Sequence, residues 1–270
     1  MFHNKLRGLG LEEDENVISF FAGNFLENDE GLDEKELKDT LPILPLRNTI
    51  VFPGSGLPIS VGREKSLKLI KSLGKNHKYI GLVCQKEAND ENPTSEDLYN
   101  IGVIAEIIRI IEIDNNTSSV IVQAKTRFEI IEMVQTEPFF TARYKVLESI
   151  KADKDDKEYQ ALLDSIRDSM NHALHLLGNP PKELIQTINH KSFTNMLVSY
   201  SATNLPIENR EKQELLSISD EKEQAYRLLM ILNRETQILE LKMNIQMKTR
   251  EDLNQQQKEF FLQQQIKTIQ

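Results

Sequence analysis

The sequence contains a single cysteine, Cys84, which excludes an internal disulfide framework. One thiol fits a reducing compartment and predicts a cytoplasmic location. No apolar run approaches the length of a membrane span, and the first ten residues lack the apolar core of a signal peptide. The net charge is −9 and no five consecutive residues are Lys or Arg. We therefore expect neither nucleic acid nor a membrane among the partners.

Motifs for nucleotide binding and catalysis are missing as well. The eleven glycines form no phosphate-binding loop, no Gly-x-Gly-x-x-Gly turn and no Gly-x-Ser-x-Gly elbow. His172 and His175 follow Asp168 at helical spacing, but ordinary helix-surface polarity explains them better than a metal site, because no second cluster supplies ligands. Cys84 lies in an apolar stretch, which favours a buried inert thiol over a nucleophile. The sequence thus predicts no catalytic, cofactor-binding or metal-binding residue.

A change of composition at residue 41 divides the chain. Residues 1–40 hold eleven Asp or Glu against four Lys or Arg, which is typical of a mostly disordered segment. Residues 41–150 instead combine short β-branched runs with prolines and tight turns. This pattern predicts a compact β-rich domain, a small barrel or a curled sheet.

The β-rich region has one dominant hairpin. Residues 101–113 contain seven isoleucines and are followed by an Asp-Asn-Asn turn and a returning strand at 117–134. Further strands are expected at 78–85 and 139–148. Residues 63–74 have helical apolar spacing and predict a short amphipathic helix that ends at glycine.

Helical patterns replace the strands after a charged linker at 151–158. Residues 159–218 predict a helical subdomain, and residues 219–270 predict one helix of about 50 residues, or about 75 Å. Asp220 is its expected N-cap, with Glu223 completing a capping box. Its first half carries an apolar stripe that should pack on the preceding helices: Ala225, Leu228, Leu229, Leu232, Leu239, Met243 and Met247.

The last residues of that helix are apolar without an obvious partner. Phe260, Phe261, Leu262 and Ile266 are too few for a good monomer core and too apolar to be left in water, and no glycine or cap ends the helix. We expect this stretch to pack against another copy or further chain, and the native polypeptide to continue.

Several short motifs point to one family. They comprise Leu44–Arg47, Val51–Gly54, Pro58, Val61–Arg63 and Ser66, then Gly102 and Ala105, and finally Gln257, Glu259, Leu262, Gln265, Lys267, Ile269 and Gln270. In this order they resemble the N-terminal region of Lon, the ATP-dependent protease of the AAA+ class, over residues 41–270. The chain departs from the family pattern at Asn48, at Ser55 and Gly56, and at Phe260 and Phe261, which replace a tyrosine pair.

The resemblance implies a fold and a role. The fold class is α+β, with a β-rich PUA-like subdomain followed by a helical bundle that ends in the long helix. The role is non-catalytic recognition and tethering of unfolded or damaged proteins for a hexameric motor. ATP, Mg and the serine protease activity belong to the full-length parent, and the other subunits of a homohexamer are expected partners.

The expected client or subunit contacts are Phe52, Leu57, Pro58, Phe260, Phe261, Leu262 and Ile266. Phe52 has a competing interpretation as a core residue that closes a strand. The phenylalanine pair could lie between long helices of the hexamer, contact substrate or pack within the chain. Two further hypotheses remain for the whole chain: a structural element that supports hexamerisation, and an RNA-binding PUA-like domain, against which the acidic charge argues.

Overall fold

The computed structural model describes residues 32, 36–73, 78–114, 117–153, 155–176, 182–190, 194–205 and 207–269. At 114, 182–184, 187, 194–195, 204 and 260–269 only the backbone is described. Residues 1–31 and 33–35 of the segment 1–40 that was predicted to be mostly disordered lie outside the described part, whereas residue 40 already belongs to a strand. The expected helix end at Gly74 and the side chains of Phe260, Phe261, Leu262 and Ile266 also lie outside the described part.

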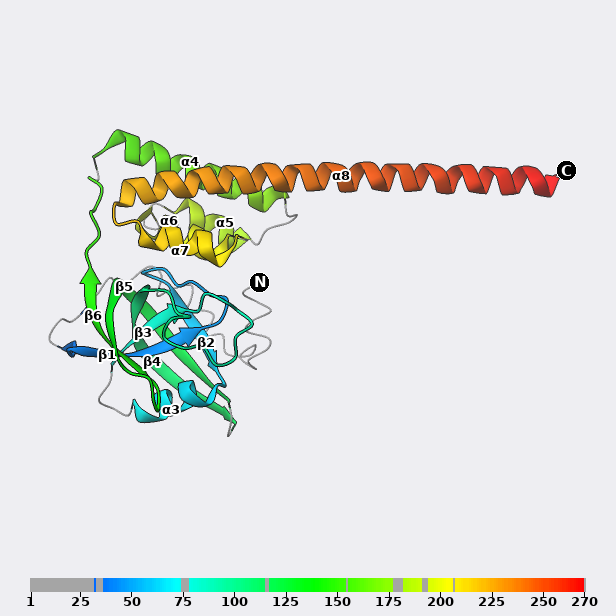
Figure 1. Ribbon diagram of the computed structural model, residues 1–270. Coiled ribbons are helices and arrows are strands. Elements are labelled where there is room, and N and C mark those ends of the chain that lie inside the picture. Colours follow the sequence, from blue (N-terminus) through cyan, green and yellow to red (C-terminus); the bar gives the residue numbers. More distant parts are fainter. Residues whose placement is uncertain are drawn as a thin grey trace.

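The N-terminal half is a closed, mixed β-sheet. Its elements are β1 (Thr40–Leu46), β2 (Gly56–Val61), α3 (Glu64–Ser72), β3 (Tyr79–Cys84), β4 (Ile101–Asp114), β5 (Thr117–Gln135) and β6 (Phe140–Leu147). The strand order is β2-β5-β4-β3-β1-β6, and a β5–β6 pairing closes five of the strands into a barrel (Figure 1). The α+β class and the dominant hairpin, now β4 and β5, are confirmed.

The length of β5 produces this closure. Its 19 residues pair with β4 along one edge. The opposite edge pairs first with β2, through 118–123, and then with β6, through 127–135. β2 is therefore attached to the barrel through β5.

Two glycines of the family motifs are required by close packing or by backbone conformation. A Cβ at Gly102 would collide with the Leu82 carbonyl oxygen and lie 2.7 Å from Val83 Cγ2. Gly54 has a φ of +82° in the β1–β2 connection, where side chains are strained. Asn48 in the same connection has a φ of 54°, a conformation that asparagine tolerates better than most residues. The asparagine that departs from the family pattern at residue 48 therefore suits the left-handed backbone conformation found there.

The C-terminal half is helical. It contains α4 (Lys157–Leu176), α5 (Lys182–Asn189), α6 (Thr194–Asn204), α7 (Asn209–Ser217) and α8 (Glu221–Ile269). Helix α4 begins within the expected charged linker. Helix α8 lies along α4 and then continues far beyond the bundle (Figure 1).

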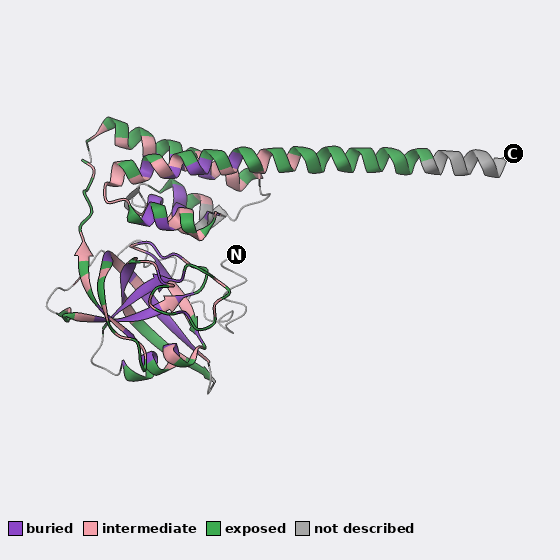
Figure 2. Cartoon of the chain, viewed as in Figure 1, coloured by how far each residue is buried: buried purple, intermediate pink, exposed green. Residues whose placement is uncertain are grey.

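The predicted start and length of α8 agree with the structure. Asp220 caps it by accepting hydrogen bonds from the Lys222 and Glu223 amides at 2.9 and 3.0 Å. The predicted apolar stripe is correct as far as Leu232, but Met247 is 55% exposed. Figure 2 shows the helix exposed once it passes the end of α4, where no described element lies against it. The prediction failed there because helical spacing alone does not provide a packing partner.

The barrel and the bundle share one apolar core, which includes side chains from both halves. Arg127 of β5, only 2% exposed, crosses between them. It donates from Nη1 to the carbonyls of Leu216 (3.0 Å) and Ile218 (2.6 Å) at the end of α7. From Nη2 it donates to the Glu148 carbonyl (3.2 Å) and to Ser149 Oγ (3.1 Å). Burial lowers the pKa of Arg127, and Glu221 partly offsets this effect.

Replacing Arg127 with methionine should destabilise the fold. The Arg127→Met change preserves much of the apolar volume but removes the donor from the buried Leu216 carbonyl and from the partly buried carbonyls of Ile218 and Glu148, so we expect a loss of about 2–4 kcal/mol in the free energy of unfolding. Urea denaturation followed by circular dichroism measures it. The matched control is Arg143→Met, which removes an exposed ion pair with Glu132 and should cost less than about 1 kcal/mol. Equal effects of the two changes would contradict the proposed role of Arg127.

Candidate peptide-binding cleft

Two strand edges face each other without pairing. β2 pairs with β5 on one side, and no other described strand pairs with it. β1 pairs with β6 only through 40–43, so the edge of Leu44–Leu46 opposite β3 is also free. Because β5 holds β2 away from β1, a cleft of about 520 Å³ separates these two edges. Its size lies within the range of ordinary ligand pockets.

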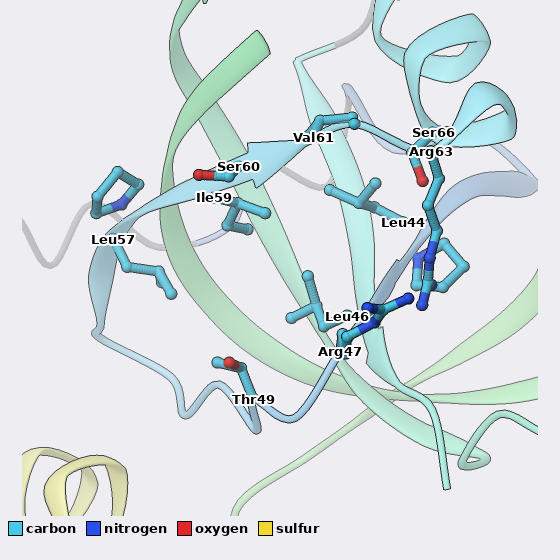
Figure 3. A pocket seen from close by; sticks show the side chains of 13 residues that line it. Leu44, Leu46, Arg47, Thr49, Leu57, Ile59, Ser60, Val61, Arg63 and Ser66 are labelled. Carbon is cyan, nitrogen blue, oxygen red and sulfur yellow. The ribbon is translucent and has the colours of Figure 1, made fainter. Parts of the chain in front are cut away.

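Both apolar and polar side chains line the cleft, and the apolar ones contribute the larger share. The lining residues are 44–47, 49, 57–63 and 66 (Figure 3). Leu44, Leu46 and Val61 are buried, while Leu57 and Ile59 are partly buried and pack against the same core. The cleft therefore offers apolar side chains together with free backbone groups.

The orientation of the backbone explains why both edges tolerate proline. The Gln85 amide donates to the Leu46 carbonyl (3.0 Å), so Leu46 turns its backbone toward β3 and Pro45 turns the other way. Likewise the Ala124 amide donates to the Ser55 carbonyl (2.9 Å), and alternation from Ser55 places the backbone of Pro58 at the free edge. Neither proline interrupts a ladder, and both reduce the number of donors on an open edge, which limits uncontrolled strand pairing.

Two arginines lie at the same end of the cleft (Figure 3). Arg63 donates from Nη2 to Gln85 Oε1 (2.7 Å) and to the Asp90 carbonyl (2.9 Å), so it is fixed to the loop after β3. Burial lowers the pKa of Arg63 first, and the like charge of Arg47 lowers it further, while Asp90 and Glu91 act in the opposite direction. Arg47 is exposed and has no ion pair or side-chain hydrogen bond with the described residues. Arg63 is therefore held in place by hydrogen bonds, whereas the Arg47 guanidinium makes none with the described residues.

The structure separates the predicted contact residues. Leu57 and Pro58 line the cleft. Phe52 is 1% exposed and belongs to the core, as its competing interpretation held, so its side chain is not accessible to a client. Arg47 and Arg63 were not predicted as site residues, although both occur in the motifs that carried the family resemblance. The signal was present in the sequence, but only the fold brings the two motifs to one cleft.

The other residues considered for chemistry have ordinary roles. His172 Nε2 lies 2.6 Å from Glu240 Oε1 and connects α4 to α8. Cys84 is buried, and burial raises the pKa of its thiol, which makes the thiolate scarce. Among the side chains that the structure describes, no three His, Cys, Asp or Glu gather as a metal site would require. The described helices also include none with the length and apolarity needed to cross a bilayer.

Comparison with known proteins agrees with this architecture. The sequence model of the ATP-dependent protease La (LON) substrate-binding domain matches residues 40–234. A Lon protease from Parabacteroides distasonis is 50% identical over 236 residues, which cover 87% of this chain and 29% of that protein. A Lon protease from Porphyromonas gingivalis is 44% identical over 264 residues, covering 96% of this chain and 31% of that protein.

A solved structure shows the same fold. The N-terminal domain of the Mycobacterium avium complex Lon protease superposes with a TM-score of 0.54 at 20% identity, covering 73% of this chain and 98% of that one. The class defined by the fold is therefore that of a β-barrel joined to a helical bundle, as in that N-terminal domain. The sequence match is more specific, and the chain belongs to the Lon substrate-binding domain family. It spans less than a third of the length of the two Lon proteases compared.

The two arginines should respond differently to substitution. Arg63→Met removes a hydrogen-bonded cation and leaves Gln85 and the Asp90 carbonyl without that donor. We expect a loss of about 1–2 kcal/mol in unfolding free energy, and faster amide exchange in the loop after β3. Arg47→Met should change stability by less than about 0.5 kcal/mol, because Arg47 has no such contacts. Denaturation and hydrogen-exchange mass spectrometry distinguish them, and a larger loss for Arg47→Met would contradict the assignment.

Proposed function

We propose that this chain captures non-native polypeptide segments and holds them for ATP-dependent proteolysis. Its membership of the Lon substrate-binding domain family supports this function. The observation that carries it is the cleft, in which two free strand edges lie beside apolar side chains. An extended chain can add to such an edge through its backbone while its side chains enter the apolar pockets.

The arrangement selects unfolded over folded clients on physical grounds. A folded protein keeps its backbone groups paired and most of its large apolar side chains inside. An unfolded segment exposes both at once. The prolines at the cleft edges leave few donors for a ladder, so each contact is weak and tolerant of sequence. Several copies of the chain in one assembly would increase the residence time of a client by avidity.

The remaining parts of the proposal concern the longer protein. The chain itself acts without catalysis, and the parent supplies a serine protease and an ATPase that uses ATP and Mg²⁺. The chain would then act in the cytoplasm as one subunit of a homohexamer, with α8 leading toward the motor. The apolar residues Phe260, Phe261, Leu262 and Ile266 stay proposed contacts with clients or neighbouring subunits.

A second candidate function is structural support of the hexamer. Its basis is the exposed apolar surface of α8, where Leu241, Ile245 and Leu253 are 61%, 57% and 55% exposed. Side chains at this spacing could pack against another long helix. This alternative predicts self-association that depends on concentration and no preference for unfolded clients.

The deciding measurement is a fluorescence-anisotropy titration of the 270-residue chain against one labelled client, in its unfolded and folded states, at two salt concentrations. We expect binding of the unfolded client, little weakened by salt, because the main contacts are apolar and backbone contacts. Leu57→Ala should weaken this binding about three- to tenfold by removing an apolar side chain that lines the cleft.

The control for that variant is Leu253→Ala, which removes an apolar side chain of α8 far from the cleft. It should leave client binding unchanged if the cleft is the site. The reverse pattern, with loss of binding only in Leu253→Ala, would assign recognition to α8. Equal binding of folded and unfolded clients would refute the proposed selection.

A further inference from the structure

The cleft lining carries positive charge although the chain as a whole is negative. This difference bears on which polypeptide segments the cleft would bind under the proposed function. The protein carries a net charge of −9. The cleft lining nevertheless includes Arg47 and Arg63 and no acidic residue. Asp90 and Glu91 act on Arg63 from the neighbouring loop but are not part of the lining. A bound segment therefore meets positive charge at this end of the cleft.

The two guanidinium groups are held in different ways, and the difference suits a ligand site. Arg63 is partly buried and committed to Gln85 and the Asp90 carbonyl through Nη2. Arg63 places a second positive charge beside Arg47, and Asp90 and Glu91 offset the repulsion only at Arg63. Arg47 makes no side-chain hydrogen bond or ion pair with the described residues, so its donors can all turn to a ligand.

A third donor lies at the same end. Ser66, in the first turn of α3, is 6% exposed and lines the cleft. Its hydroxyl makes no hydrogen bond to any residue that the structure describes. Because Ser66 lines the cleft, its hydroxyl can donate to a ligand oxygen there.

The acceptor best suited to these donors is a carboxylate. Arginine's planar fork matches the two oxygens of a carboxylate, and charge-assisted hydrogen bonds of this kind are stronger than neutral ones. The free edges beside the arginines accept an extended backbone, and an extended chain carries such a group either on an acidic side chain or at its C-terminus.

We propose that the cleft selects extended segments that carry a carboxylate, which binds Arg47 and Arg63 while the adjoining apolar residues lie on Leu57 and Ile59. This inference rests on the proposed function and adds a specificity to it. Arg47 is the specificity-determining residue, since Arg63 is already engaged. An acidic side chain and a chain terminus offer the same chemistry and are separated by experiment.

The test uses the 270-residue chain and a labelled eight-residue peptide of alternating valine and threonine in four forms. The C-terminus is either free or amidated, and the penultimate residue is either aspartate or asparagine. The doubly neutral form should bind about tenfold more weakly than the form with the preferred carboxylate. If the free terminus is the ligand, amidation alone causes the loss; if the side chain is the ligand, asparagine alone causes it.

The variant that tests the site is Arg47→Gln. It should reduce binding of the carboxylate peptide about tenfold and change binding of the neutral peptide less than twofold. Arg47→Lys should bind the carboxylate peptide with an affinity between those of the unchanged chain and Arg47→Gln, because lysine keeps the positive charge but lacks the planar guanidinium. The matched control is Arg250→Gln on the exposed part of α8, which should leave all four affinities unchanged.

The outcomes separate this inference from the proposed function. Equal binding of all four peptides, or equal loss in Arg47→Gln and Arg250→Gln, overturns the carboxylate specificity while binding of unfolded clients still supports the general function. A chain that binds neither the peptides nor an unfolded client overturns both. If Arg47→Gln does not weaken binding of the carboxylate forms, the anion site lies elsewhere, and this result also overturns the inference.

Discussion

The Arg127 guanidinium lies buried between the barrel and the helical bundle, and its need for hydrogen-bond acceptors determines how the two halves join. A buried cation is tolerated only where acceptors surround it. Here the acceptors are backbone carbonyls at the end of α7 and after β6, together with Ser149 Oγ. The carbonyls that end a helix carry partial negative charge, so they suit an arginine. The long strand β5 is thereby connected at one point to both the bundle and the end of β6.

The cleft follows from the pairing of that same strand. One edge of β5 serves β2 and then β6 in succession, so β2 cannot also reach β1. The free edges that result would normally be an aggregation hazard. Pro45 and Pro58 reduce this hazard by removing donors on the open side, yet they leave carbonyl groups and apolar side chains accessible. A binding site and a protected edge are thus two consequences of one strand arrangement.

Much of the local structure could be predicted from the sequence because it depends on near neighbours along the chain. Isoleucine-rich runs around Asp-Asn-Asn predicted the β4–β5 hairpin, and Asp220 predicted the start of α8. Predictions that depended on distant partners did less well. The apolar stripe of α8 was expected to stay packed through Met247, but the structure places nothing described against it there. For Phe52 the sequence left a contact role and a core role open, and the structure decides for the core, because its burial depends on strands elsewhere in the chain.

The sequence by itself determined the fold class, the order of strands and helices and the family, because patterning, turn chemistry and short motifs are properties of contiguous residues. Only the tertiary structure decided which residues share a site. Arg47 follows β1 and Arg63 precedes α3, and neither position shows from spacing alone that the two charges lie together. They meet because β5 holds β2 at one side of the opening while β3 and β6 hold β1 at the other. That separation is set by strand pairing over long sequence distances, which no local pattern records.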